Sequence, residues 1–166
     1  MKRPKTPTFY TVELREVDGL YRAYVHALAV SCSASSPVRA SSQIEHDLAD
    51  VLDEFMRLGR YIPEDDPTDT GSTGVVFTLT DVQIEKIELH NRIIEHLRSM
   101  RHYEYINSPA AALDELLVSI EQEIDSKAGY LRKILQTTNA TWVDAKTLSK
   151  INRFLRRRPD RAQQIT

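Results

Sequence analysis

The chain has 166 residues, of which 41% are hydrophobic and 28% charged, so it can bury a core and is too apolar for wholesale disorder. Its 22 basic and 24 acidic side chains give a net charge of −2, which indicates no polyanionic partner for the chain as a whole. No apolar run approaches the roughly 20 residues of a membrane span, and no signal core follows the basic start. The single cysteine excludes internal disulfides. We therefore expect a cytoplasmic protein without a membrane segment.

The first predicted element is a β-hairpin over residues 8–28. Apolar and polar side chains alternate through residues 8–17 and again through residues 20–28, as in half-buried strands. Asp18-Gly19 lies between the two runs and favours a type I′ turn, which needs positive φ at both central residues. The short, small-sided segment 29–33 is a candidate third strand.

A long helix is predicted next. Residues 34–41 are rich in Ser and Ala and are predicted as a loop, and Ser42-Gln43-Ile44-Glu45 has the form of a capping box. Apolar residues at helical spacing then predict an amphipathic helix over residues 43–58. Gly59 is a suitable left-handed residue to end it.

Beyond an acidic linker over residues 63–73, one strand and three helices are predicted. Residues 75–80 alternate as a strand does, and Ser108 and Thr141 are the predicted N-caps of the last two helices. The three helices are predicted over residues 82–101, from Pro109 with an apolar stripe that reaches Leu135, and from Thr141 to about Arg158. The predicted fold class is therefore α+β, with a β-β-β-α-β unit followed by a three-helix region.

Four segments of the first half resemble the HicB family of antitoxins. The turn Val17-Asp18-Gly19 and the stretch Ala23–Leu28 resemble the family's hairpin and its Ala-Tyr-x-Pro-x-Leu stretch. Leu58–Pro63 resembles the end of the family's helix, and Gly74–Val82 resembles its last strand. The element order β-β-β-α-β, a truncated ribonuclease-H-like fold, agrees over residues 8–84.

This resemblance implies a non-enzymatic binding protein. Family members neutralise a small ribonuclease toxin by covering it, usually as dimers or larger oligomers, and often bind operator DNA. We accordingly expect a HicB-like domain over 1–84, a helical domain over 85–166, a toxin-type protein partner and a homodimer or larger homo-oligomer. The alternative is an inhibitor from a phage or mobile element, similar to an anti-CRISPR protein, that blocks a nuclease or a nucleic-acid-binding surface.

Residue spacing gives no catalytic or metal-binding constellation. His90, His96 and His102 are six residues apart, a rotation of about 240° per step along a helix, so they cannot share a face. Cys32 has no Cys-x-x-Cys partner and is predicted to pack as a small hydrophobe. The hairpin lacks the clustered carboxylates of a two-metal ribonuclease centre. We therefore predict no enzyme activity, metal or cofactor, with a divergent nuclease as the weakest hypothesis.

The near-neutral total conceals a charge gradient. Residues 1–63 hold 8 basic and 8 acidic side chains. Residues 64–125 hold 4 basic and 14 acidic ones, a balance of −10, whereas residues 126–166 hold 10 basic and 2 acidic ones, a balance of +8. Two interpretations stay open: the acidic middle neutralises the basic end, or the basic end meets a polyanion.

The basic end contains the strongest candidate for a binding site. On a helix over residues 142–158, Leu148, Ile151 and Leu155 share one face, and cations occupy the opposite face. Such a helix packs through one side and presents cations to phosphates on the other. The predicted nucleic-acid-binding residues are Lys146, Lys150, Arg153, Arg156, Arg157 and Arg158.

Overall fold

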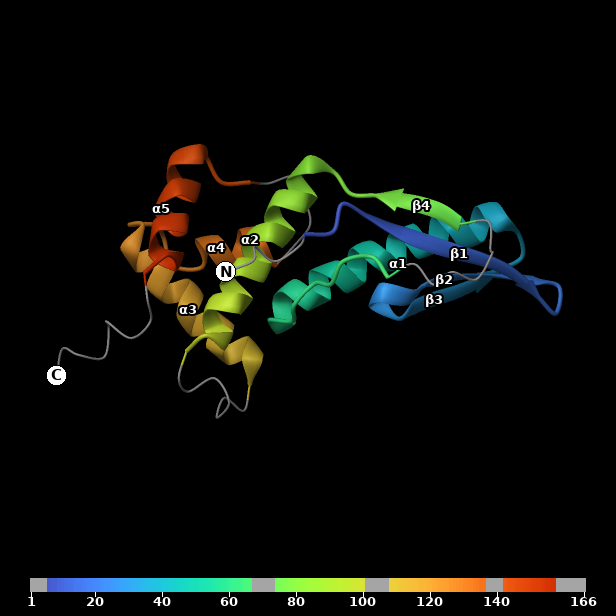
Figure 1. The fold of residues 1–166 in the computed structure, drawn as a ribbon, viewed down its shortest axis with the longest axis horizontal. Helices are drawn as coiled ribbons and strands as arrows, with labels where there is room; N and C mark the ends of the chain where they lie inside the picture. The colour runs from blue at the N-terminus through green and yellow to red at the C-terminus, as the bar shows by residue number, and fades with distance from the viewer. Residues whose placement is uncertain (1–5, 67–73, 101–107, 137–141, 158–166) are drawn as a thin grey trace.

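The computed structural model describes residues 6–66, 74–100, 108–136 and 142–157. The α+β class is confirmed: a four-stranded sheet with helix α1 packed on it lies at one end of the molecule, and the other helices gather at the opposite end (Figure 1). The elements are β1 (Phe9–Val17), β2 (Leu20–Val25), the 3-10 helix η1 (His26–Leu28), β3 (Val30–Ala34), α1 (Pro37–Leu58), β4 (Gly74–Thr78), α2 (Asp81–Arg98), α3 (Pro109–Glu123), α4 (Tyr130–Leu135) and α5 (Ala145–Leu155). None of the helices in these ranges is long and apolar enough to cross a membrane.

The sheet has the strand order β3-β2-β1-β4, and every neighbouring pair is antiparallel. Asp18 and Gly19 both have positive φ, 53° and 80°, which confirms the predicted hairpin turn. The second strand is shorter than predicted, because the chain leaves it after Val25 for one 3-10 turn. Ala29, with a φ of 52°, ends that turn and leads into β3.

The predicted start of the long helix was wrong. α1 begins at Pro37, because the Ser36 hydroxyl accepts the Arg39 amide at 3.2 Å and proline at the first turn forfeits no helical hydrogen bond. The expected capping box at residues 42–45 therefore lies inside the helix. The predicted end is confirmed, since Gly59 has a φ of 69° and closes the helix in the left-handed conformation.

The segment predicted as one helix from Pro109 to Leu135 is two helices. α3 ends at Glu123, and the chain turns through Asp125 and Gly129, both at positive φ, before α4 begins. Glu121, although buried, holds this turn: its carboxylate accepts the Gly129 amide at 2.9 Å and the Leu131 amide at 2.8 Å. One acidic side chain thus caps α4 from the neighbouring helix.

The last helix also starts later than predicted. The Asp144 carboxylate accepts the Thr147 amide at 2.7 Å, so α5 begins at Ala145. The predicted cap, Thr141, and the predicted last residue, Arg158, lie outside the described residues. The helix that carries the predicted site therefore runs from Ala145 to Leu155.

Two clusters of buried apolar residues meet along α2. The first lies between the sheet and α1 and extends to Ile87 on α2. The second begins at Leu89 and joins α2 to α3, α4 and α5. The predicted boundary at residue 84 falls inside α2, and the division into domains 1–84 and 85–166 stays a prediction.

Candidate nucleic-acid interface

Helix α5 is fixed to the helical core by its apolar face. Ile151 is completely buried, and Leu148 and Leu155 are half-buried against the second cluster, as their spacing predicted. Burial of a side chain as large as isoleucine contributes roughly 2 kcal/mol. This seating sets which side of the helix faces solvent.

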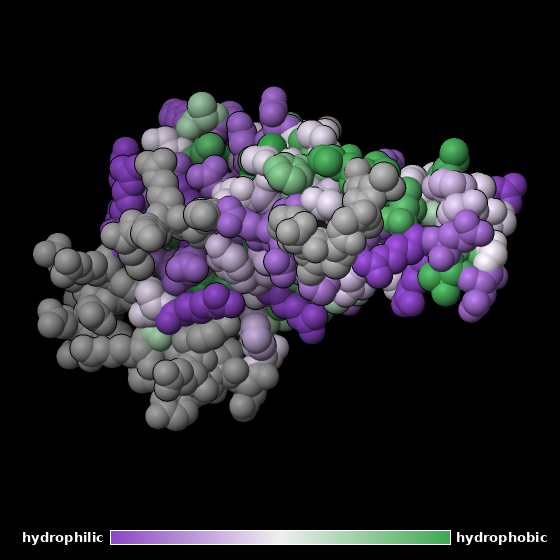
Figure 2. Space-filling view, turned by 45° about the vertical axis from the view of Figure 1, so that its right-hand side comes forward, coloured by the Kyte–Doolittle hydropathy of each residue, from purple (hydrophilic) through white to green (hydrophobic). Residues whose placement is uncertain are grey.

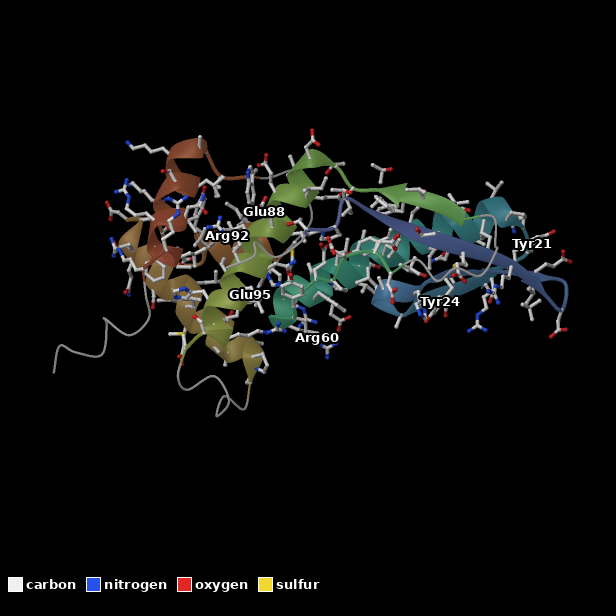
Figure 3. The ribbon with its side chains drawn as sticks, viewed as in Figure 1. Tyr21, Tyr24, Arg60, Glu88, Arg92 and Glu95 are labelled. Atoms are coloured by element: carbon white, nitrogen blue, oxygen red, sulfur yellow. The ribbon has the colours of Figure 1, made fainter. Side chains whose placement is uncertain are left out.

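Polar and aromatic contacts attach the same helix to α2. The Arg92 guanidinium donates to the Asn152 side-chain oxygen at 2.6 Å, and the rings of His96 and Phe154 lie 6.0 Å apart between centroids. Figure 3 shows Arg92 at the middle of α2, on the side nearer α5. These contacts lie at the flanks of the apolar face and leave the opposite face of α5 uncovered.

The uncovered face carries the predicted cations. Eleven residues of helix span about 16 Å, a distance comparable to the rise of about five base pairs along the axis of a DNA duplex. Arg158 lies outside the described residues, whereas the other five predicted side chains are all exposed: Lys146, Lys150, Arg153, Arg156 and Arg157. The structure therefore places three of the six predicted residues on α5 and two, Arg156 and Arg157, directly after its last residue.

The acidic middle and the basic end do meet, at the end of α5. The Arg157 guanidinium lies 2.7 Å from the Glu123 carboxylate at the end of α3. Both side chains are largely exposed, so the ion pair contributes less than about 1 kcal/mol. Among the described residues, no acidic side chain forms an ion pair with the other four cations of the face. Neutralisation by the acidic middle is thus partial.

A shallow, open hollow of about 350 Å³ runs along one side of this face. Four polar or cationic side chains line it together with two apolar ones, so a polar or anionic group can enter it. The hollow is lined by Ala145, Leu148, Ser149, Asn152, Arg153 and Arg156. The hollow adjoins the exposed cations. We call the five exposed cations and this hollow together the α5 surface.

The described histidines form no metal site, and Cys32 has structural surroundings. No group of three His, Cys, Asp or Glu side chains within the described ranges could hold a metal ion. The Cys32 thiol donates to the Ala40 carbonyl at 3.4 Å, and burial, assisted by the Asp47 carboxylate, raises the pKa of that thiol. A protonated thiol is a poor nucleophile, so Cys32 acts as a packing residue.

Sequence reasoning missed a polar junction between the end of α1 and α2. The side-chain amide of Asn91 accepts from the Ile62 amide and donates to the Ile62 carbonyl, both at 2.8 Å. The His90 ring nitrogen Nε2 donates to the Arg60 carbonyl at 2.7 Å. Both side chains are buried, and the only sequence signal was two polar residues within the apolar stretch of α2. This junction joins the two apolar clusters.

The same segment is also tied to the sheet. The Tyr10 hydroxyl donates to the Pro63 carbonyl at 2.7 Å. The Asp65 carboxylate accepts the Thr11 amide at 3.0 Å and the Thr11 hydroxyl at 2.6 Å. The start of the predicted acidic linker is therefore part of the folded structure, because its carboxylate and carbonyl groups satisfy donors of β1.

His90 predicts a measurable pH dependence. Burial lowers the pKa of His90 to about 4 from its usual 6.5, so the folded chain keeps this ring neutral. The unfolded chain binds a proton between those two pH values, and the free energy of unfolding therefore falls as pH falls through this window, by up to about 3 kcal/mol. Urea unfolding at intervals from pH 7 to pH 4 measures this fall, and His90→Gln, which keeps a donor for Arg60, should flatten it. An equally steep fall in that variant would contradict the assignment.

Comparison with protein-family models and with curated proteins found no match to this sequence.

Proposed function

We propose that the protein is a non-enzymatic HicB-like antitoxin or regulator, which binds and neutralises a toxin-type protein partner and binds nucleic acid through the α5 surface. The observation that carries the nucleic-acid part is the exposure of five cations, three on the outer face of α5 and two directly after its end, while Ile151 on the opposite face is buried. The element order β-β-β-α-β, which the sequence resemblance implied, supports the HicB-like part.

The arrangement of the cations has a cost for the helix itself. Lys146 and Lys150 are four residues apart within α5, and such a like-charged pair destabilises a helix by about 0.2–0.5 kcal/mol. Helix stability therefore does not account for this stripe. The phosphates of a nucleic acid would offset the repulsion between these cations, because each phosphate attracts a cation. Binding would also release the counterions condensed on the nucleic acid.

The surface is suited to the backbone of nucleic acid. Arginine guanidinium groups bind phosphate oxygens through two parallel hydrogen bonds, and lysines add point charges. Asn152, the side chain on α5 best suited to reading adenine, already accepts from Arg92. We therefore expect contacts that fix position and affinity, with little discrimination between base sequences.

Salt dependence tests this proposal. With four phosphate contacts, the logarithm of the binding constant for duplex DNA should fall with the logarithm of salt concentration with a slope of about −3.6. Fluorescence anisotropy with a labelled duplex, between about 50 and 200 mM salt, measures this slope. Sequence-scrambled duplexes should bind with similar affinity. An absence of binding at the lowest salt would overturn the nucleic-acid part of the proposal.

A further inference from the structure

Strand β4 ends the sheet on one side. Among the described residues, no segment pairs with its outer edge, and Figure 1 shows it at the margin of the sheet. Proteins usually protect such an edge with charged side chains, proline or a bulge, since its free amide and carbonyl groups invite another strand. The sequence Gly-Val-Val-Phe-Thr of β4 contains no charge and no proline.

Large apolar side chains are exposed along this edge. Val75 is 40% exposed, Val76 is 54% exposed, and Phe9 on the neighbouring strand is 43% exposed. Figure 2 shows hydrophobic surface along the same side of the sheet. The opposite edge, β3, differs, because its exposed side chains are Ser31 and Ser33. The apolar edge is therefore specific to β4.

The hydrogen bonds of β1 show which groups of β4 face outward. Thr11 stands opposite Val76, yet its amide donates away from β4, to Asp65. Opposite residues of an antiparallel pair alternate between hydrogen-bonded and non-bonded positions. The Thr11–Val76 pair is therefore non-bonded, and the amide and carbonyl of Val76 point outward. The same holds two residues away on either side, at Gly74 and Thr78.

The outward amide and carbonyl groups of one β4 can form hydrogen bonds with the same groups of another β4. We propose that β4 pairs antiparallel with β4 of a second copy of the chain about a twofold axis at Val76. The two Val76 residues then exchange both backbone hydrogen bonds, and Gly74 of each copy faces Thr78 of the other. Val75 of each copy faces Phe77 of the other on the side of the sheet that α1 covers. One sheet would thus run through both copies, without opposing like charges. Because α5 lies at the other end of the molecule, this inference does not depend on nucleic-acid binding.

A charge-swap experiment tests the pairing. Val76→Lys places two lysines directly opposite each other on the twofold axis, where like charges disfavour strand pairing. Sedimentation velocity at about 100 µM, a concentration at which even a weak dimer is populated, should show twice the mass of one chain for the wild type and one chain for the variant. Val118→Lys, which replaces an exposed valine on α3, is the matched control and should stay dimeric.

Mixing completes the test. Val76→Glu alone should also be monomeric, whereas an equimolar mixture of Val76→Lys and Val76→Glu should regain the dimer, because opposite charges then meet on the axis. Thermal melting of each variant shows whether the fold is retained at this exposed position. A monomeric wild type at the highest concentration, or a dimeric Val76→Lys variant, would overturn the proposal.

Discussion

Replacing four exposed cations of the α5 surface with alanine is expected to weaken binding to duplex DNA by about 10³–10⁴-fold near 100 mM salt. Each phosphate that a cation neutralises adds close to 0.9 to the logarithm of the binding constant at this salt concentration, so the loss of all four contacts lowers that logarithm by about 3.6. The salt slope should fall in parallel, by about 0.9 for each contact removed. The variant carries Lys146→Ala, Lys150→Ala, Arg153→Ala and Arg156→Ala.

The same variant should fold at least as well as the wild type. Alanine has the highest helix propensity, and the substitution removes repulsion between neighbouring cations, while Ile151 still anchors the helix. Weaker binding therefore cannot be attributed to unfolding. A control with the same change in net charge replaces four exposed cations outside α5: Arg22, Arg39, Arg57 and Lys133. Equal losses in the two variants would contradict a local site.

The sheet was the most predictable part of the fold. Side-chain alternation with a period of two identifies a strand without any knowledge of its neighbours, and the two positive φ values at Asp18 and Gly19 follow from residue types that tolerate them. The pairing of β4 with β1 was not predictable in the same way. It joins residues far apart in sequence, and nothing local determines that register.

The helix boundaries show where local patterns compete with tertiary contacts. Two caps were available for α1, and the upstream one was selected, because it places Ala40 in complete burial against the sheet. The break after α3 depends on Glu121, whose buried carboxylate binds amides eight and ten residues ahead. An acidic residue in an apolar stripe indicates that its carboxylate has buried hydrogen-bond donors. The sequence does not show which residues provide those donors.

The candidate site was predictable because it is one helix. The apolar and cationic faces of α5 follow from helical spacing alone, so the exposure of Lys146 and Arg153 needed no tertiary information. The ion pair between Arg157 and Glu123 and the polar junction at α2 were not predictable. Both depend on how separate elements meet in space.

Replacing Asn91 with leucine is expected to lower the free energy of unfolding by about 2–6 kcal/mol. Leucine has nearly the same shape, so packing is retained, but the amide and carbonyl of Ile62 would both remain buried without a partner. Each unsatisfied backbone group costs about 1–3 kcal/mol. Equilibrium unfolding in urea at pH 7 measures the loss, and Gln122→Leu, at an exposed position on α3, provides a control with the same change in chemistry.

The control should change stability by no more than about 0.5 kcal/mol, as surface substitutions usually do. A similarly small loss for Asn91→Leu would mean that water reaches Ile62 and that the junction does not hold the two apolar clusters together. His90 offers an independent check, because it holds Arg60, two residues before Ile62. If the segment is clamped as a unit, the losses from Asn91→Leu and His90→Leu should be smaller together than their sum, since the first substitution already releases part of what the second removes.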